Sequence, residues 1–307
     1  MKKVIIAVDA GGTSTRVNVI DKDKNILFDK VYACGSPAVL GDDDEAFANI
    51  YGGVSDAYAF SQDECFIEAI IIGISGLDVV KNIDKYKLEF EEAFNAEVLI
   101  TQDAVLAIYS IVTDMHNEGI LVLSGTGSAV MAIKNNQTRL YGGWGRLLTE
   151  VGSAYTTVRD LINSMIRNYE AGNEVTTLGK RFLERLGYSN VKELKYFVYP
   201  STSTKIAGHA KFVSDAAHID NNEEAIAILQ KGGYDLALDV QNAYKGLNLS
   251  SDAVIGFRGG FISNAPIMQN ELILQLEKIG INLKVVAGDK DPIYGAFYMA
   301  KRMGYLC

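Results

Sequence analysis

The segment Asp9-Ala-Gly-Gly-Thr-Ser-Thr15 and the residues around it decide the fold of this chain. It follows Val4-Ile-Ile-Ala-Val8, a short continuous apolar run that predicts a buried strand. Residues 16–20 and 26–32 then alternate between apolar and polar side chains on either side of the polar stretch 21–25. The pattern predicts a meander of three antiparallel strands, with a glycine-rich turn between the first two.

A second copy of this order of elements begins at residue 119. Gly119-Ile-Leu-Val-Leu123 predicts a strand that leads into Ser124-Gly-Thr-Gly-Ser128, and strand patterns follow at 129–133 and 139–142. In both halves strand and helix patterns alternate after the meander, and the second half has additional helical stretches between 177 and 248. We therefore predict an α/β protein of duplicated βββαβαβα topology.

We expect two domains, an N-terminal one at 1–117 and a C-terminal one at 118–291, with the additional helices inserted in the second. The last helical stretch, 292–307, has few partners in its own half, so we expect it to pack on the N-terminal domain. The duplication predicts that the two glycine-rich turns face each other across an interdomain cleft. That cleft is the expected binding site.

Composition and charge exclude several classes of function. The chain has 307 residues, 48% hydrophobic side chains and a formal net charge of −9, which disfavours nucleic acid and anionic membranes as partners. No stretch approaches the ~20 apolar residues of a membrane-spanning helix, and the first apolar run ends at Asp9, too early for a signal peptide. Neither the histidines nor Cys34, Cys65 and Cys307 show a disulfide pattern or metal-ligand spacing. These features predict a cytoplasmic protein with a small-molecule partner.

The two glycine-rich turns have the composition of a phosphate-binding site. Glycines after a strand let backbone N–H groups approach phosphate oxygens, and threonine hydroxyls add donors. The first turn offers Gly11, Gly12, Thr13 and Thr15, and the second offers Gly125, Thr126 and Gly127. An ordinary glycine-containing hairpin explains either turn alone equally well. Because both turns occupy the same place in a repeated order of elements, we interpret them as a two-sided phosphate clamp.

Other nucleotide-binding motifs are absent from the sequence. It contains no G-x-x-x-x-G-K-[ST] loop, and no G-x-G-x-x-G pattern follows a strand and opens a helix. Gly259-Gly260, after the strand pattern 253–257, offers a flat backbone surface for an adenine ring. On its own this last signal has little specificity.

Two aspartates lie at the ends of predicted strands. Asp9 ends the first strand at the glycine turn, where its carboxylate could hold Mg²⁺ through a bound water or, alternatively, stabilise the turn as an Asx residue. The neighbouring turn favours the magnesium role. Asp103 lies where a strand pattern gives way to a helix, and there it could take a proton from an attacking hydroxyl group. A helix N-cap role explains Asp103 equally well.

The stretch from Tyr141 to Ser153 contains the single tryptophan of the chain, Trp144, followed by Gly145. An aromatic ring can cover the apolar face of a sugar, and Glu150 could accept hydrogen bonds from sugar hydroxyls. A core tryptophan in a glycine-rich turn is the equal alternative.

Seven motifs occur in the order typical of the BadF/BadG/BcrA/BcrD-type ATPases, a family of the actin/hexokinase/Hsp70 superfamily. They are Asp9-Ala-Gly-Gly-Thr-Ser-Thr15, Gly73-Ile-Ser-Gly76, Gln102-Asp-Ala104, Ser124-Gly-Thr-Gly-Ser128, Gly142-Gly-Trp-Gly145, Gly152-Ser-Ala-Tyr155 and Gly259-Gly260. The fifth and sixth motifs resemble those of the N-acetylglucosamine kinase branch. Within this branch the resemblance is greatest to bacterial kinases of N-acetylmuramic acid and N-acetylglucosamine. The resemblance covers nearly the whole chain and implies two actin-like (ribonuclease H-like) domains.

The resemblance implies that the protein phosphorylates the 6-hydroxyl of an amino sugar with ATP and Mg²⁺ in cell-wall sugar salvage and closes its domains around the substrates. Proteins of this kind are often homodimers. Thr13 and Thr126 would contact the ATP phosphates, and Asp103 would be the catalytic base. The sugar would be bound by Ser36, Ser75, Gly76, Asp103, Trp144, Gly145 and Glu150.

Two departures from the N-acetylglucosamine kinases concern the sugar site. Where those kinases usually read Gly-Asp-Glu-Gly-Ser, this chain has Thr149-Glu-Val-Gly-Ser153. Where they place an asparagine near the end of the third strand, Cys34-Gly-Ser-Pro37 offers only the Ser36 hydroxyl. We interpret these changes as a relaxed pocket around the sugar O3 that admits the lactyl ether of N-acetylmuramic acid.

Several other functions compete with this hypothesis. A glucosamine kinase would share the architecture and differ in the pocket for the 2-amino group. A dehydratase-activating ATPase of the same superfamily would need cysteines for an iron–sulfur cluster, and a kinase of the ROK type would show a zinc-binding cysteine cluster. The cysteines of this chain fit neither pattern. A filament or chaperone role would need an additional module for which the chain has no length.

Overall fold

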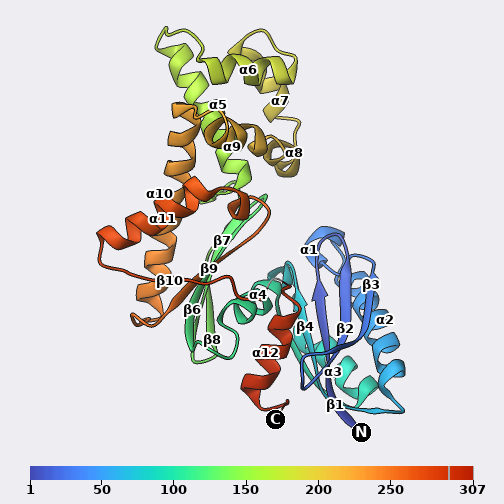
Figure 1. Ribbon diagram of the computed structural model, residues 1–307. Helices are drawn as coiled ribbons and strands as arrows, with labels where there is room; N and C mark the ends of the chain where they lie inside the picture. Colours follow the sequence, from blue (N-terminus) through green and yellow to red (C-terminus); the bar gives the residue numbers. More distant parts are fainter. Residues whose placement is uncertain (290, 307) are drawn as a thin grey trace. The chain divides into compact units, whose positions relative to one another are not determined.

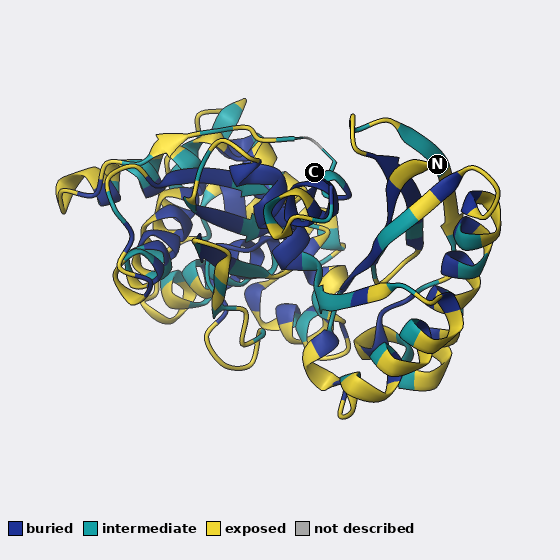
Figure 2. Ribbon diagram, turned by 90° about the horizontal axis from the view of Figure 1, so that it is seen from below, coloured by how far each residue is buried: buried dark blue, intermediate teal, exposed yellow. Residues whose placement is uncertain are grey.

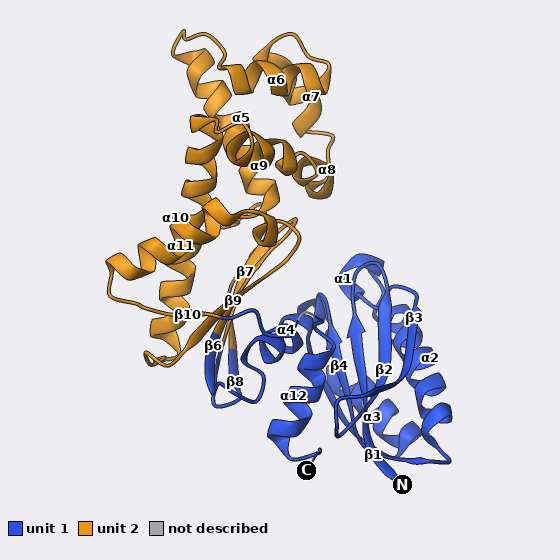
Figure 3. Cartoon of the chain, in the orientation of Figure 1, with its two compact units in different colours: residues 1–119, 133–138, 286–307 blue, residues 120–132, 139–285 orange. Residues whose placement is uncertain are grey.

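The structure is a computed structural model that describes residues 1–289 and 291–306, so Cys307 lies outside the described residues. The chain divides into two compact units (Figure 3). Unit 1 comprises Met1–Gly119, Ile133–Thr138 and the segment from Val286 onward, and unit 2 comprises Ile120–Ala132 and Arg139–Val285. Unit 1 is therefore assembled from the N-terminal part of the chain, a short middle segment and the C-terminal part.

The sheet of unit 1 has five strands in the order β3-β2-β1-β4-β5 (Figure 1). The predicted antiparallel meander is confirmed as β1 (Lys2–Ala10), β2 (Thr15–Asp21) and β3 (Ile26–Tyr32). The strands β4 (Cys65–Ile74) and β5 (Glu97–Gln102) continue the sheet in parallel with β1. The carboxyl ends of β1, β4 and β5 consequently meet at one edge, which is where ligands bind in sheets of this kind.

One face of this sheet is covered by α2 (Asp43–Ser61) and α3 (Ile83–Phe94). Both helices share a buried core with alternate residues of β1, among them Val4, Ile6 and Val8. This alternation follows from the two-residue period of a strand, which directs successive side chains to opposite faces.

The helices α4 (Asp103–Val112) and α12 (Tyr294–Met303) contact β1 and β4 and cover the other face. Helix α4 is apolar nearly all round, and its residues from Ala104 to Val112 are all buried. The two helices approach most closely at Gly295, where a Cβ would overlap the carbonyl oxygen of Leu106. Glycine is therefore required at this crossing.

The second sheet also has five strands, in the order β10-β9-β6-β7-β8. Their bounds are β6 (Glu118–Ser124), β7 (Ser128–Lys134), β8 (Gln137–Gly142), β9 (Val254–Arg258) and β10 (Lys284–Val285). Within each sheet the strands can be numbered from first to fifth in the order in which they occur along the chain. Both sheets then have the same spatial order, which is third, second, first, fourth and fifth, counted from β3 in one sheet and from β8 in the other. The predicted duplicated α/β architecture is confirmed by this shared order.

Most of the described helices belong to unit 2, as Figure 3 shows in orange, and they form its large apolar core. Figure 2 draws buried residues of the chain in dark blue. The helices of unit 2 are α5 (Ala154–Glu170), α6 (Thr177–Leu186), η2 (Val191–Glu193), α7 (Leu194–Val198), α8 (Ser203–Ala207), α9 (Ala210–His218), α10 (Glu223–Gly246), η3 (Ile262–Asn264) and α11 (Pro266–Lys278). Unit 1 has two further short elements, α1 (Pro37–Leu40) and η1 (Leu77–Val79). None of the helices in the described part of the chain combines the length and apolar character needed to cross a bilayer.

Candidate active site

The glycine-rich turn of unit 1 connects β1 to β2. A hydrogen bond from the Gly11 N–H to the Ser14 carbonyl oxygen closes it (2.9 Å), and the Gly35 N–H donates to the Gly11 carbonyl oxygen (3.3 Å). Gly12 and Thr13 are exposed. Their donor groups are therefore accessible to a phosphate.

Thr15, the first residue of β2, is fully buried. Its hydroxyl has no hydrogen-bond partner among the described residues and lies where a side chain on Gly35 would otherwise be. An enclosed hydroxyl cannot reach a phosphate, so the predicted phosphate contact of Thr15 does not fit its position. Thr13 remains as the accessible threonine of the turn.

Asp9 lies at the end of β1, close to two other carboxylates, Asp103 at the start of α4 and Asp291 before α12. Burial raises the pKa of Asp9 from 3.8 to about 6, and repulsion from Asp103 and Asp291 adds to this shift. The charge of Arg16 lowers the pKa in part. A cation at this edge of the sheet would relieve the repulsion. The Mg²⁺ held through water beside Asp9 stays a prediction.

Arg16 ties the segment before α12 to the meander. It is the antiparallel partner of Asp9 in the β1–β2 ladder. Its guanidinium donates two hydrogen bonds to Asp29 of β3 (2.9 and 2.8 Å) and another to Asp291. Sequence analysis missed Arg16 and Asp291 as residues of this site. The strand register marks Arg16 as a neighbour of Asp9, whereas no local pattern marks Asp291, which is 275 residues from Arg16.

Asp103 opens helix α4, but it does not cap it. Gln102 occupies the N-cap position with an extended backbone and makes no side-chain cap hydrogen bond. Asp103 Oδ1 accepts a hydrogen bond from the N–H of its neighbour Ala104 (2.8 Å). The N-cap alternative thus does not describe the position of Asp103, and the role of catalytic base stays a prediction.

Ser36, Ser75 and Gly76, three of the predicted sugar-binding residues, lie together at the carboxyl end of β4. The Ser36 hydroxyl is buried and donates to the Ser75 carbonyl oxygen (2.7 Å). Gly76 packs against Ala38 of α1 with a φ of 72°. The Ser36 side chain therefore joins α1 to the end of β4 and points inward.

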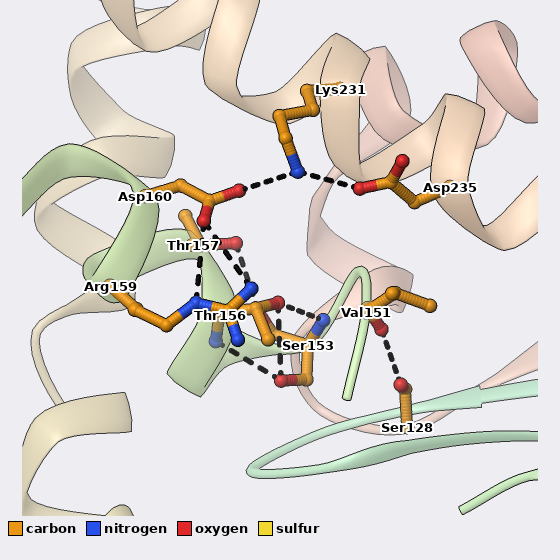
Figure 4. A network of polar contacts seen from close by, with 9 residues as sticks. All are labelled: Ser128, Val151, Ser153, Thr156, Thr157, Arg159, Asp160, Lys231 and Asp235. Atoms are coloured by element: carbon orange, nitrogen blue, oxygen red, sulfur yellow. Dashed lines mark hydrogen bonds and ion pairs between the residues drawn. The ribbon is translucent and has the colours of Figure 1, made fainter. Parts of the chain in front are cut away.

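The glycine-rich turn of unit 2 connects β6 to β7 and is held by the segment that leads into α5 (Figure 4). The connecting hydrogen bonds run from the Ala154 N–H to Gly125 O (2.9 Å), from the Tyr155 N–H to Thr126 O (3.3 Å), from Ser124 Oγ to Gly152 O (2.7 Å) and from Ser128 Oγ to Val151 O. Thr126 and Gly127 are exposed, so their donor groups are accessible from outside the turn.

The start of α5 is itself anchored to the rest of unit 2. Ser153 and Thr156 form a reciprocal capping box at its N-terminus. One turn further, Asp160 pairs with Lys231 of α10 (3.0 Å), which also pairs with Asp235 (2.7 Å), as Figure 4 shows. Through this network the position of the second glycine turn depends on the helical core.

A cavity of about 790 Å³ opens beside the second turn, lined by residues of unit 2 alone. Gly125, Thr126 and Gly260, all predicted to bind ATP, line it together with side chains from α8, α9 and η3. Lys211 on its wall is paired with Asp215 (2.6 Å). The volume lies within the range of about 300–1,000 Å³ that small-molecule sites have. The cavity therefore fits a nucleotide in size.

Gly259, at the end of β9, has a structural reason to be glycine. Its φ is 111°, and a Cβ would overlap the carbonyl oxygen of Ser124. The same carbonyl accepts a hydrogen bond from the Phe261 N–H (3.2 Å). Gly259 thus lets the end of β9 lie directly against the second turn.

The loop that precedes α5 presents apolar side chains to solvent. Trp144 is 70% exposed, and Leu147 and Leu148 are 82% and 71% exposed. The core alternative for Trp144 is therefore wrong. Gly145 has a left-handed φ of 86°. Glu150, at the end of the loop, is buried by contrast and accepts a hydrogen bond from the Ser128 N–H, while Ser128 Oγ lies 3.0 Å from its Oε1.

No group of three or more histidine, cysteine, aspartate or glutamate side chains within residues 1–289 and 291–306 is arranged to hold a metal ion directly. His218 Nδ1 bonds within its own helix to Ser214, and His209 packs against the rings of Phe182 and Phe197. These two histidines have structural partners.

The chain resembles kinases of amino sugars along its whole length. It is 25% identical to the N-acetylmuramic acid/N-acetylglucosamine kinase of Clostridium acetobutylicum over 309 residues, which cover 97% of this chain and 98% of that protein. Its structure is similar to a provisionally assigned N-acetylglucosamine kinase from Chromobacterium violaceum, with a TM-score of 0.67, 20% identity and 99% of each chain covered. A ROK family glucokinase from Streptomyces griseus in complex with glucose and AMPPNP matches with a TM-score of 0.58, 18% identity, and 98% and 100% of the two chains covered.

The structural likenesses show a shared two-domain, actin-like α/β fold. The sequence also matches the model of one family from residue 6 to residue 300, and this family of ATPases implies the use of ATP. Since the match spans nearly the entire chain, the protein belongs to the BadF/BadG/BcrA/BcrD ATPase family.

Proposed function

We propose that this protein is an ATP-dependent kinase that phosphorylates the 6-hydroxyl of N-acetylglucosamine and N-acetylmuramic acid. The observation that supports this most is the duplicated turn: both five-strand sheets carry a glycine-rich turn between their first two strands. The second turn opens on a cavity of nucleotide size. The names of the curated relative and of the similar structures agree with an amino sugar as the acceptor.

Each unit has its own part in the proposed reaction. Unit 1 binds phosphate through the exposed residues Gly12 and Thr13 and takes up the proton of the sugar hydroxyl on Asp103. Unit 2 binds phosphate through Thr126 and Gly127 and the adenosine part of ATP in the cavity beside Gly260. Backbone donors that are held rigidly stabilise negative charge as it develops on the transferred phosphoryl group.

The proposed chemistry is an in-line displacement at the γ-phosphorus of ATP. The sugar O6 attacks as Asp103 accepts its proton, and ADP leaves. When bound, Mg²⁺ would neutralise phosphate oxygens, and Asp9 would hold it through water. A positioned carboxylate of this kind typically contributes a rate gain of about 10²–10⁴-fold.

The sugar pocket is proposed to accept N-acetylmuramic acid because two of the predicted sugar contacts have hydrogen-bond partners within the protein. The Ser36 hydroxyl is buried against Ser75, and the Glu150 carboxylate is buried against Ser128. With both groups engaged in these bonds, fewer side chains would contact a sugar O3, and the bulky lactyl ether would have more room. Trp144 and Gly145 remain as the proposed sugar contacts of unit 2.

A coupled ADP-release assay with N-acetylglucosamine, N-acetylmuramic acid, glucosamine and glucose tests the proposal. We expect turnover with both N-acetylated sugars. Turnover with glucosamine alone would identify a glucosamine kinase, and ATP consumption that needs no sugar would favour a dehydratase-activating ATPase. Turnover of N-acetylglucosamine without any turnover of N-acetylmuramic acid at high concentration would contradict the relaxed pocket.

The same assay tests the role of Asp103. Replacing Asp103 by Asn should lower turnover by roughly 10²–10⁴-fold while sugar affinity, measured by calorimetry, stays nearly unchanged. Asp84→Asn is the matched control, because Asp84 is an exposed residue in the first turn of α3. Near-normal turnover of Asp103→Asn would refute Asp103 as the base.

A further inference from the structure

Glu150 is placed to organise the second glycine turn. Its side chain is buried, with 7% exposure, and its carboxylate accepts a hydrogen bond from the Ser128 N–H. Ser128 Oγ lies 3.0 Å from the same carboxylate and shares its single proton between Glu150 and Val151 O. A buried carboxylate is tolerated where such donors satisfy it. The Ser128 N–H directs this carboxylate toward the turn, and the neighbouring hydroxyl contributes a shared hydrogen bond.

The packing around the carboxylate is close. A Cβ added to Gly127 would lie 3.3 Å from Glu150 Oε1, so the carboxylate lies directly against the exposed part of the turn. The other contacts of the segment 151–155 with the turn are made by its backbone atoms, two N–H groups and two carbonyl oxygens. Glu150 therefore holds the turn through its side chain, whereas residues 151–155 hold it through their backbone.

We propose that Glu150 is a positioning residue for phosphate binding at the Gly125–Gly127 turn and does not bind the sugar. The inference rests on the proposed function, because it assigns the turn to the phosphates of ATP. The N-acetylglucosamine kinases that this chain resembles usually carry aspartate at this place, and the additional methylene of Glu150 gives the reach to Ser128. Glu150 also ends the exposed loop of Trp144, so it joins the proposed sugar loop to the phosphate turn.

The test separates nucleotide binding from sugar binding by titration calorimetry, with the ATP analogue AMPPNP and with N-acetylglucosamine as probes. Glu150→Ala removes the acceptor, and Glu150→Asp withdraws it by one methylene. We expect both variants to raise the Kd of AMPPNP by about 10-fold, with the Kd of the sugar within about twofold of the wild type. Glu150→Gln keeps an oxygen at the position of Oε1 and should restore AMPPNP affinity to within about threefold.

Glu170→Ala, which changes an exposed glutamate at the end of α5, is the matched control and should bind both probes normally. Glu150→Asp keeps the test valid if Glu150→Ala fails to fold. A weaker sugar affinity with unchanged AMPPNP affinity would overturn the inference, and so would normal binding of both probes by Glu150→Ala and Glu150→Asp. A wild type that binds AMPPNP but phosphorylates no amino sugar would overturn the proposed function, while the AMPPNP titrations would still decide the role of Glu150.

Discussion

Asp9 is held in the folded protein at a cost in stability. It is partly buried near Asp103 and Asp291, and the raised pKa of its carboxyl reports that the ionised form is disfavoured there. Carboxylates gathered in this way are typical of sites that receive a cation or a proton. The ionised Asp9 carboxylate is thus destabilised in the folded protein, and bound Mg²⁺ would reduce this destabilisation.

The pKa of Asp9 predicts how stability depends on pH. A carboxyl whose pKa is raised from 3.8 to about 6 contributes full stability below pH 3.8 and loses it as the pH rises to about 6. Asp9→Asn should therefore be more stable than the wild type at pH 7.5, by on the order of 1–3 kcal/mol. At pH 4 the two proteins should differ much less.

Urea unfolding at both pH values, in magnesium-free buffer with EDTA, measures this difference. A wild type that is more stable than Asp9→Asn at pH 7.5 would contradict this prediction. It would show that favourable contacts of the Asp9 carboxylate outweigh the cost of its burial. Asp84→Asn, at an exposed position, is the control and should shift stability by less than about 0.5 kcal/mol at either pH.

At the scale of single residues, the sequence indicated which residues lie near the turns better than it indicated where their side chains point. Thr13 is accessible as predicted for a phosphate ligand, whereas Thr15, two positions later, is buried. Strand alternation is the reason, since Thr15 is the first residue of β2 and pairs with Ala10 of β1. Glu150 was predicted to contact a sugar and is buried against Ser128, because this partner lies in β7, 22 residues earlier in the chain.

At the scale of elements, the crossing of α12 and α4 carries the segment that contains Asp291 into unit 1. The crossing depends on Gly295, whose Cα faces the backbone of Leu106. In the same unit Lys24, in the turn between β2 and β3, pairs with Asp289 (2.6 Å) and contacts the Tyr298 hydroxyl of α12 (2.9 Å). The start of α12 is thus held from two sides.

A methyl group at the helix crossing should be poorly tolerated. Gly295→Ala places its Cβ on the Leu106 carbonyl oxygen, so α12 must move away from α4, and we expect a loss of about 2–3 kcal/mol in the free energy of unfolding. Gly52→Ala is the matched control, because Gly52 lies in helix α2 with no atom within 4 Å of an added Cβ. That change should be neutral or stabilising by up to ~1 kcal/mol. Equal effects of the two substitutions on urea unfolding would contradict the close crossing.

Elements with a strong local pattern were predictable, and short ones were not. The meander and the strand-to-helix passage at Asp103 follow from apolar periodicity, and both are observed. The elements α1 and η1 were not predicted, because four and three residues are too few to show a period. Their positions depend on tertiary contacts such as the hydrogen bond from Ser36 to Ser75.

At the scale of the whole molecule, unit 1 needs both ends of the chain. Helix α12 buries the residues from Gly295 to Ala300, and it contacts β1, β4 and α4 of the N-terminal part. Each large apolar side chain among them contributes roughly 1.5–3 kcal/mol by its burial. Together they approach the total stability of about 5–15 kcal/mol that is typical of a domain.

Removal of residues 292–307 should therefore unfold unit 1 and leave the core of unit 2 intact. Hydrogen exchange read by mass spectrometry should show loss of protection in β1, β4 and α4. Peptides from α5 and α10 provide the internal control and should stay protected, since their core lies within unit 2. Protection of β1 and α4 that survives the truncation would show that unit 1 folds without its last helix.

The sequence by itself determined the duplicated order of strands, the two glycine-rich turns and the family, because each depends on neighbours along the chain. Only the tertiary structure decided where several side chains point. The hydrogen bonds of Ser36, Glu150 and Arg16 span 39, 22 and 275 residues. Such a side chain points toward whichever distant atom completes its hydrogen bond, and the fold alone brings that atom near.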